Sequence, residues 1–291
     1  MVELTLVDSP SATVAPRLRE SPTVRALRRP GVVMSTLVAV TVVAWAILPG
    51  IFTSWDPLVG VPAQRLQGPS LNHLFGTDQL GRDLFARVVY GSSLSLLATL
   101  TAVAVALVFG STLGLVAGFL GGWIDDVVMR VVDVLLAIPA LLLSLALVTA
   151  LGFGTVNVAI AVGVATAANF ARVMRSEVLR VRGGVFVEAA RLSGVRWYGV
   201  LLRHVLPNAT GPVVVMAALE FGTAILAVSA LSFLGFGAAP PAPEWGSLVA
   251  GGRNHMATAW WLTTLPGVVV GATVLAANRL SRAVEGVGHN D

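Results

Sequence analysis

Long stretches without charge alternate with short charged segments along this chain. A helical bilayer crossing needs about 20 mostly apolar residues, and the uncharged stretches supply six such segments. The gap between Asp133 and Arg172 is too long for one crossing, and the glycine-rich run at 152–157 divides it into a hairpin. We therefore expect an all-α integral membrane protein with transmembrane helices at 32–51, 94–119, 134–151, 158–172, 212–234 and 260–278.

This pattern also gives the organisation of the chain. About 30 polar residues precede the first apolar stretch and no small-residue cleavage site follows it, so we expect no cleaved secretory signal. These residues, rich in proline and serine, are expected to be disordered until they reach the membrane. The expected parts are an N-terminal tail at 1–30, a first transmembrane helix at 31–53, a loop at 54–90, a five-helix core at 91–280 containing a loop at 173–208, and a tail at 281–291.

Composition agrees with a membrane protein and excludes several kinds of site. Only 12% of the 291 residues are charged, against about 25% in an average soluble domain, and 56% are apolar. The chain has no cysteine, which excludes thiol nucleophiles, thiolate metal sites and disulfides. It also has no lysine, because all 19 basic residues are arginine. A P-loop needs a lysine to reach the β- and γ-phosphates, so any energy from ATP must come from a partner.

The arginines indicate the orientation in the membrane. With six crossings, both termini and the loops after the second and fourth spans share one side, and these segments hold fifteen of the 19 arginines. Because cytoplasmic loops carry an excess of Arg and Lys, we expect both termini in the cytoplasm and the chain in a bacterial cytoplasmic (inner) membrane. The net charge of +4 is then explained by the arginines on the cytoplasmic side of the membrane, so we expect no nucleic-acid partner.

The loop at 173–208 is too polar to cross a membrane and too apolar for a solvated linker. It contains Glu188-Ala189-Ala190-Arg191-Leu192-Ser193-Gly194, which predicts a short helix with a small alanine face, ended by Gly194 in a left-handed conformation. A second short helix should follow, and we expect Pro207 to stop it before the next span. Two interpretations remain open: a docking surface for another protein, and an interfacial helix that rests on lipid headgroups.

Several motifs in this order resemble one transporter family. The run from Glu188-Ala189-Ala190 through Gly194 to Leu206-Pro207 resembles the cytoplasmic signature of the permease subunits of ABC importers, with His204 at a usually aliphatic position. Other segments are similar to the C-type dipeptide, oligopeptide and nickel permeases, and the likeness covers about 33–278. These segments are Phe75-Gly76-Thr77-Asp78-Gln79-Leu80-Gly81-Arg82-Asp83, Gly121-Gly122-Trp123-Ile124-Asp125-Asp126 and Leu231-Ser232-Phe233-Leu234-Gly235-Phe236-Gly237.

The resemblance implies a type I importer permease with six transmembrane helices and a coupling helix between the fourth and fifth. It implies a non-catalytic subunit that forms half of a path for di- or oligopeptides. The implied partners are a second permease subunit in a heterodimer, two ATPase subunits or domains that bind ATP and Mg, and an extracytoplasmic substrate-binding protein. The implied ATPase-coupling residues are Phe186, Glu188, Ala189, Ala190, Gly194, Leu206 and Pro207.

The chain departs from the family pattern at several positions. Gly183-Gly184-Val185 stands where the family often has a charged run, and Val228 stands where it commonly has a glutamate. Glu220 lies eight residues before Val228, about 80° around a helix from it. The C-terminal tail lacks the usual acidic run.

Polar side chains inside predicted spans are costly to place in lipid and often line a pathway, so Glu220 and Asn169 are candidates for the translocation path. An ion pair or an interhelical hydrogen bond is the alternative for Glu220, and a helix cap or bridge for Asn169. On the opposite side, Asp78, Arg82 and Asp83 are candidates for a binding-protein contact. A local cap and salt bridge before the helix is the alternative for these three residues.

Other features indicate packing or anchoring. Gly110, Gly114 and Gly118 recur every four residues and predict close helix packing. The scattered histidines offer no metal motif, so we expect neither metal nor cofactor in this chain. Tryptophans near the predicted span ends are expected as interfacial anchors, namely Trp123, Trp260 and Trp261.

Three functions are alternatives to a peptide permease. A nickel or other small-solute ABC permease shares the same motifs. An ion-coupled secondary transporter should show inverted repeats and several intramembrane acids, whereas this chain has one acid and no evident repeat. An intramembrane protease would need a Gly-x-Ser-Gly nucleophile, paired aspartates or a zinc motif, and none is present.

Overall fold

The computed structural model describes residues 30–288 of the chain. The tail predicted to be disordered therefore lies, apart from Pro30, outside the described residues. Within them the regular structure is helical, as expected for an all-α protein. The elements are α2 (Pro30–Ile47), α3 (Pro49–Phe52), η1 (Pro62–Gln64), α4 (Leu84–Leu120), α5 (Gly122–Ala137), α6 (Ala140–Leu151), α7 (Thr155–Arg182), α8 (Val185–Leu192), α9 (Trp197–Val200), η2 (Leu201–Val205), α10 (Leu206–Phe233), α11 (Trp245–Gly252), η3 (Arg253–His255) and α12 (Trp261–Gly288).

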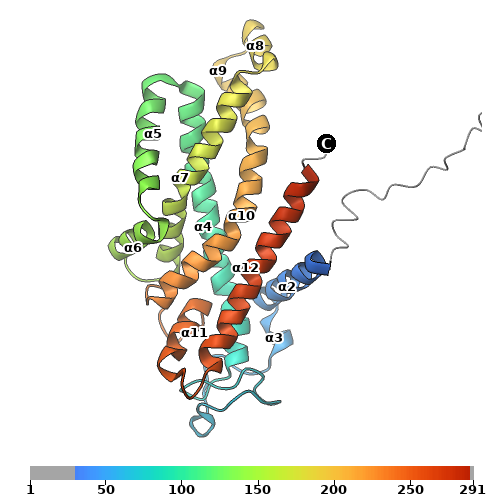
Figure 1. Ribbon diagram of the computed structural model, residues 1–291, viewed down its shortest axis with the longest axis vertical. Coiled ribbons are helices and arrows are strands. Elements are labelled where there is room, and N and C mark those ends of the chain that lie inside the picture. The colour runs from blue at the N-terminus through green and yellow to red at the C-terminus, as the bar shows by residue number, and fades with distance from the viewer. Residues whose placement is uncertain (1–29, 289–291) are drawn as a thin grey trace, which may run out of the picture.

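Five helical segments are long and apolar enough to cross a membrane: α2, α4, α7, the segment Trp197–Phe233 that ends with α10, and α12. The bent pair α5–α6 is a sixth candidate, so the six predicted crossings are present when that pair counts as one. Figure 1 shows α4, α7, α10 and α12 running along the molecule, with α2 beside α12 and with α5 and α6 on the opposite side. The chain is a multi-pass membrane protein.

The third predicted crossing, at 134–151, is not a straight helix. α5 begins at Gly122, α6 follows after a short break, and the two are bent by 99°. Pro139 causes this break, because proline lacks a backbone N–H and disfavours the helical conformation at the residue before it. Ile138 is accordingly extended, with φ −95° and ψ 130°. Counting apolar residues alone missed the effect of this proline.

The second predicted crossing begins earlier than expected, at Leu84 rather than near residue 94. Asp83 is the N-cap, and its Oδ1 accepts a hydrogen bond from the Ala86 N–H at 2.6 Å. A carboxylate at this position satisfies a backbone donor that the first helical turn leaves free. α4 therefore extends beyond the apolar stretch into the loop region that precedes it.

α4 and α7 pack closely along the interior of the bundle. Gly110 and Gly114 lie at this contact, where their missing side chains let the helix backbones approach. A Cβ on Gly110 would stand 2.6 Å from Phe170 Cβ, and a Cβ on Gly114 would stand 2.9 Å from Met174 Cβ. Gly118 continues the same buried row one turn further along α4. Small residues thus allow close approach at a place where any larger side chain would separate the helices.

The hairpin turn predicted at 152–157 is present between α6 and α7. Gly152 and Gly154 have positive φ values of 93° and 123°, which glycine adopts without steric cost. The Asn157 side chain closes the turn by donating to the carbonyl oxygens of Leu151, Gly152 and Phe153 at 3.1–3.3 Å.

The prediction that Pro207 stops a short helix before the fifth span was wrong. α9, the π-helical turn η2 and α10 form one segment, Trp197–Phe233, and Pro207 lies in the first turn of α10. In η2 the Leu206 N–H bonds to the Leu201 carbonyl, five residues back. A wider π-helical turn relieves the clash that a proline ring makes with the preceding helical turn.

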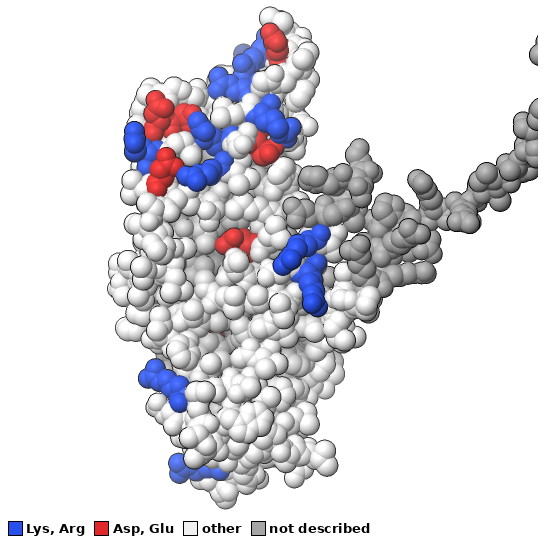
Figure 2. All heavy atoms as spheres, in the orientation of Figure 1, with Lys and Arg blue, Asp and Glu red and all other residues white. Residues whose placement is uncertain are grey.

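The bundle has two chemically different ends. One carries α8 and the junction of α4 and α5, and we call it the α8 end (Figure 1). The other carries the loop at 53–83, the connection at 234–244 and α11, which together we call the cap. Figure 2 shows blue and red side chains gathered at the α8 end, above a broad and mostly uncharged middle. Such a belt suits contact with lipid hydrocarbon, where charged side chains are costly.

Candidate functional site

α8 forms a short helix at the far end of the bundle, as predicted from the Glu-Ala-Ala run. Gly194 ends it with φ +78°, and the Gly194 and Val195 N–H groups bond back to the carbonyl oxygens of Arg191 and Ala190. This is the left-handed glycine termination expected from the sequence. No heavy atom lies within 4 Å of a Cβ built on Gly194, so its backbone conformation, not crowding, calls for glycine.

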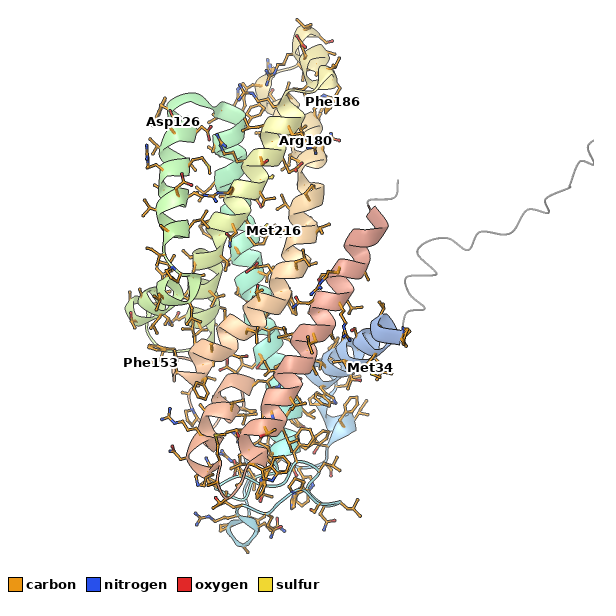
Figure 3. All side chains as sticks on the ribbon, in the orientation of Figure 1. Met34, Asp126, Phe153, Arg180, Phe186 and Met216 are labelled. Atoms are coloured by element: carbon orange, nitrogen blue, oxygen red, sulfur yellow. The ribbon has the colours of Figure 1, made fainter. Side chains whose placement is uncertain are left out.

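The surface of α8 is unusually apolar for an exposed helix. Val185 and Leu192, at its two ends, are 82% and 83% exposed. Phe186, labelled in Figure 3 beside α8, is also exposed. Glu188 and Ala189 are exposed between them, and Ala190 is half-buried. An exposed apolar surface of this kind marks a contact with a protein or a membrane.

α8 is nevertheless firmly attached to the bundle. Val187 is fully buried in a cluster with Val181 of α7, Phe119 of α4 and Val205 of η2. The aromatic rings of Phe119 and Trp197 also approach each other, with centroids 6.5 Å apart. Because packed interiors deform little, this buried side chain fixes α8 relative to the cluster.

Leu206 and Pro207 lie at the base of this surface. Leu206 is half-buried and packs against the apolar cluster that holds Val187. Pro207 is exposed on the first turn of α10. The predicted coupling residues thus lie at α8 and at the start of α10, and their role in coupling stays a prediction.

Ion pairs brace the bundle near the α8 end. Arg175 of α7 makes a bidentate pair with Asp125 of α5, with Nε–Oδ1 and Nη2–Oδ2 distances of 2.5 and 2.6 Å. Arg172 and Asp133 form a second bridge between the same helices at 2.7 Å, but these side chains are 58% and 59% exposed. The first pair ties the broken α5–α6 element to α7, whereas solvent screens the second.

The candidate path residues occupy different helices. Glu220 of α10 is half-buried and has no ion pair among the described residues. Its near neighbour Gly222 lies against Asn278 of α12, close enough that a Cβ there would clash with the amide group. Asn169 of α7 is also half-buried. The structure does not bring Glu220 and Asn169 into a common hydrogen-bonded group, and their role in a path stays a prediction.

At the cap, the three predicted contact residues are buried and bonded internally. Asp78 Oδ1 accepts from the N–H groups of Leu80 and Arg82, and Asp78 Oδ2 accepts from Arg82 Nε at 2.7 Å. Asp83 caps α4 and pairs with His73 Nδ1 at 2.9 Å. The helix N-cap and the local salt bridge, which were the alternative interpretation of these residues, are therefore present. Contact with a binding protein stays a prediction.

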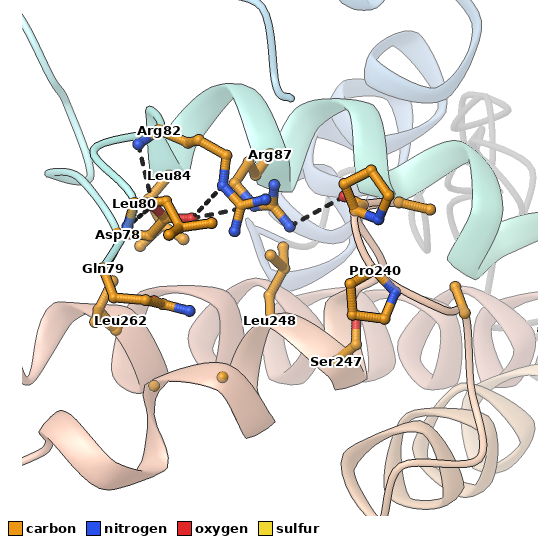
Figure 4. Close-up of a pocket in the computed structure, with 15 residues that line it drawn as sticks. Asp78, Gln79, Leu80, Arg82, Leu84, Arg87, Pro240, Ser247, Leu248 and Leu262 are labelled. Carbon is orange, nitrogen blue, oxygen red and sulfur yellow. Dashed lines mark hydrogen bonds and ion pairs between the residues drawn. The ribbon is translucent and has the colours of Figure 1, made fainter. Parts of the chain in front are cut away.

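Arg87 joins this cluster, although the sequence did not single it out. Its Nε lies 3.7 Å from Asp78 Oδ2, its Nη1 donates to the Pro57 carbonyl and its Nη2 to the Pro241 carbonyl at 3.4 Å. The three segments it joins are distant in sequence, so no local pattern could have indicated this role. A pocket opens beside the cluster, between the start of α4 and α11 (Figure 4).

Glu244 is a second residue that the sequence did not identify. Fully buried, it accepts hydrogen bonds from Ser232 Oγ at 2.5 Å and from the Ala238 N–H at 2.8 Å. It thereby fixes the connection between α10 and α11. The adjacent Trp245 is also buried and donates from Nε1 to the Val88 carbonyl, which holds α11 against α4.

The tryptophans divide between two environments. Trp123 and Trp260 are exposed, as interfacial anchors would be. Trp261 is buried and donates from Nε1 to the Thr77 carbonyl at 3.3 Å, so its expected role as an anchor was wrong. It packs inside the cap because the loop at 75–77 folds over the start of α12.

Sequence comparisons agree on one group of proteins. The family described as "binding-protein-dependent transport system inner membrane component" matches residues 110–285. The dipeptide transport system permease protein of Alkalihalophilus pseudofirmus is 41% identical, over 85% of this chain and 82% of that protein. The probable D,D-dipeptide permease protein of Escherichia coli is 39% identical over 84% and 83%, and the glutathione permease protein of Pectobacterium atrosepticum is 40% identical over 74% and 71%.

A solved structure shares the fold. One chain of a crystal structure of an amino acid ABC transporter with histidines aligns with a TM-score of 0.55 at 17% identity, covering 69% of this chain and 94% of that one. This likeness concerns the fold of the helical bundle. The chain belongs to the family of binding-protein-dependent transport system inner membrane components, as a permease subunit of an ABC importer.

Proposed function

We propose that this chain is a non-catalytic permease subunit that forms half of a translocation path for di- or oligopeptides. The names of its relatives support this substrate class, since they include dipeptide, di/tripeptide and D,D-dipeptide transport systems. ATP and Mg are bound by separate ATPase subunits in this proposal. The absence of lysine from this chain fits that division, because a P-loop requires one.

The observation that carries the coupling role is the combination of exposure and support at α8. Val185, Phe186 and Leu192 present apolar side chains outward, while Val187 is buried in an apolar cluster that also holds residues of α4, α7 and η2. A helix that only rests on lipid needs no such attachment to the bundle. We infer that α8 docks in a groove of the ATPase and transmits its movement to the spanning helices.

The orientation follows from the arginines. In this proposal the α8 end faces the cytoplasm, where the arginine-rich segments gather, and the cap faces outward towards the binding protein. Asp78, Arg82 and Asp83 then act by fixing the shape of the cap, and Glu220 and Asn169 border the path between this subunit and a second permease. The full assembly has two permeases, two ATPase subunits or domains and one binding protein.

Single-cysteine cross-linking tests the docking, because the natural chain has no cysteine. Leu192→Cys places a thiol on α8, and Leu71→Cys places a matched thiol on the cap, where Leu71 is 97% exposed. Each variant, in the assembled complex, receives a maleimide-linked photoreactive group, and the captured protein is identified by mass spectrometry. We expect Leu192→Cys to capture a subunit with a P-loop, and Leu71→Cys to capture no ATPase.

The same two variants test orientation. In intact cells, a membrane-impermeant maleimide should label Leu71→Cys and leave Leu192→Cys unlabelled until the membrane is opened. Capture of the ATPase by Leu71→Cys, or labelling of Leu192→Cys in intact cells, contradicts the proposed docking side. ATP-independent uptake by the chain alone, driven by an ion gradient, would instead indicate a secondary transporter.

A further inference from the structure

A pocket of about 460 Å³ lies in the cap, between the turn at 78–82, the first turn of α4, the connection at 238–242 and α11 (Figure 4). Its volume falls within the range of small-molecule sites, which runs from about 300 to 1,000 Å³. This volume is much larger than the volume that one amino-acid side chain would fill. None of the residues assigned to coupling lines it.

One wall of this pocket carries an excess of positive charge. Two guanidinium groups, those of Arg82 and Arg87, share a single carboxylate, that of Asp78. Arg82 and Arg87 are only 8% and 6% exposed, so solvent screens their charges weakly. Among the described residues, Arg87 Nε has no hydrogen-bond partner, since Asp78 Oδ2 lies 3.7 Å away. A buried cation without full compensation is costly, and an anion in the pocket would offset that cost.

The opposite wall is built to leave room. α11 presents Ser247, Gly251 and Gly252 to the cavity, and a Cβ on Gly251 would meet only Gln79 Nε2, at 3.9 Å. Leu248 and Leu262 add an apolar lining beside these small residues. The pocket therefore combines a cationic end, a few neutral polar groups and an apolar surface. That combination suits a small solute with one carboxylate and an apolar body.

We propose that this cap pocket binds the free carboxylate of a peptide-sized solute, with Arg82 and Arg87 as the carboxylate-binding residues. This inference rests on the proposed function, because it takes a peptide as the transported solute. One carboxylate would balance the excess positive charge, and charge-assisted hydrogen bonds to guanidinium groups are the strong ones in proteins. The pocket then acts as a holding site on the outer face of the permease, before the path opens.

The test measures equilibrium binding of tritiated dialanine to the complex in lipid nanodiscs, without the binding protein. Unlabelled N-acetyl-dialanine keeps the carboxylate and lacks the amine, whereas dialanine amide keeps the amine and lacks the carboxylate. We expect the N-acetyl compound to compete about as well as dialanine. The amide should compete at least about tenfold less well, as the loss of a charge-assisted bond predicts.

Two variants locate the binding. Gly251→Leu fills the cavity without touching a charge, and we expect dialanine affinity to fall at least about tenfold. Arg87→Gln removes the excess charge and should abolish the preference for acid over amide. Arg253→Gln, on the exposed turn η3, and Gly267→Leu, on α12 with no atom within 4 Å of its Cβ position, are the matched controls and should bind like the natural protein.

Equal competition by the amide and the acid overturns the inference, as does natural affinity in Gly251→Leu. If Gly251→Leu instead loses capture of the binding protein while keeping dialanine affinity, the pocket holds an acidic side chain of that protein and the inference is wrong. ATP-driven uptake of dialanine by the natural complex, with binding protein added, is measured separately. If dialanine binds through its carboxylate but is not taken up, the proposed peptide transport is wrong and the pocket proposal stands. If dialanine is taken up but does not bind in this way, the pocket proposal is wrong and the proposed transport stands.

Discussion

Replacing Gly110 by alanine tests whether close contact between α4 and α7 holds the bundle together. The added Cβ would lie 2.6 Å from Phe170 Cβ and would also overlap the carbonyl oxygen of Ala167. Carbon atoms in favourable contact are about 3.5–4.0 Å apart, so the helices must separate by roughly 1 Å. Phe170 is fully buried and cannot move aside into open space.

The expected cost can be bounded from known effects. Overpacking a well-packed interior costs about 1–3 kcal/mol, and alanine in place of glycine within a helix returns about 0.5–1 kcal/mol through backbone entropy. We therefore expect a net loss of roughly 0.5–2 kcal/mol, which corresponds to a melting temperature lower by about 1–8 °C. The measurement is thermal unfolding of the purified complex in detergent.

Gly271→Ala is the matched control on α12, since no heavy atom lies within 4 Å of its Cβ position. It should melt at or slightly above the temperature of the natural protein, because only the entropy effect remains. The reasoning is refuted if Gly110→Ala melts as high as Gly271→Ala. Such a result would mean that the glycine row does not set the distance between the helices.

Two further predictions concern buried and exposed polar pairs. Glu244→Met should lower the free energy of unfolding by about 2 kcal/mol, because a thioether side chain of similar length leaves Ser232 Oγ and the Ala238 N–H without their carboxylate acceptor; unchanged melting would contradict this. Arg175→Gln breaks the bidentate pair with Asp125 and should cost about 1 kcal/mol, whereas Arg172→Gln should cost close to nothing at 0.15 M salt. Chemical or thermal unfolding compares the two arginine variants, and equal losses would show that bidentate geometry contributes nothing.

The helical class and most crossings could be predicted because they depend on local composition. A charge-free run of sufficient length has few structures open to it in lipid, and glycines at 152 and 154 end one helix before the next begins. The break between α5 and α6 and the continuity through Pro207 could not be predicted by the same count. Both depend on how a proline is accommodated, and the two prolines have opposite outcomes.

The candidate sites also differ in how far the sequence predicts them. α8 is a short local motif, so a helix ended by Gly194 could be predicted from the sequence alone, and its coupling role stays a prediction. The cap pocket joins Arg87, Pro241 and Gly251, which come from three distant segments. No periodicity or spacing connects them, because their proximity follows from the packing of α11 against α4 through Trp245. Sites of this second kind require the structure.

Gly194→Pro tests most directly the proposal that α8 transmits the movement of the ATPase to the helices that line the path. Proline fixes φ near −65°, whereas Gly194 has φ +78°, so the end of α8 must rearrange while the bundle is untouched. Gly194→Asn, which tolerates positive φ, is the control. ATP hydrolysis and ATP-driven dialanine uptake are measured together in proteoliposomes containing the whole complex. We predict background uptake for Gly194→Pro and near-natural uptake for Gly194→Asn; uptake and hydrolysis at natural levels in Gly194→Pro would contradict the account.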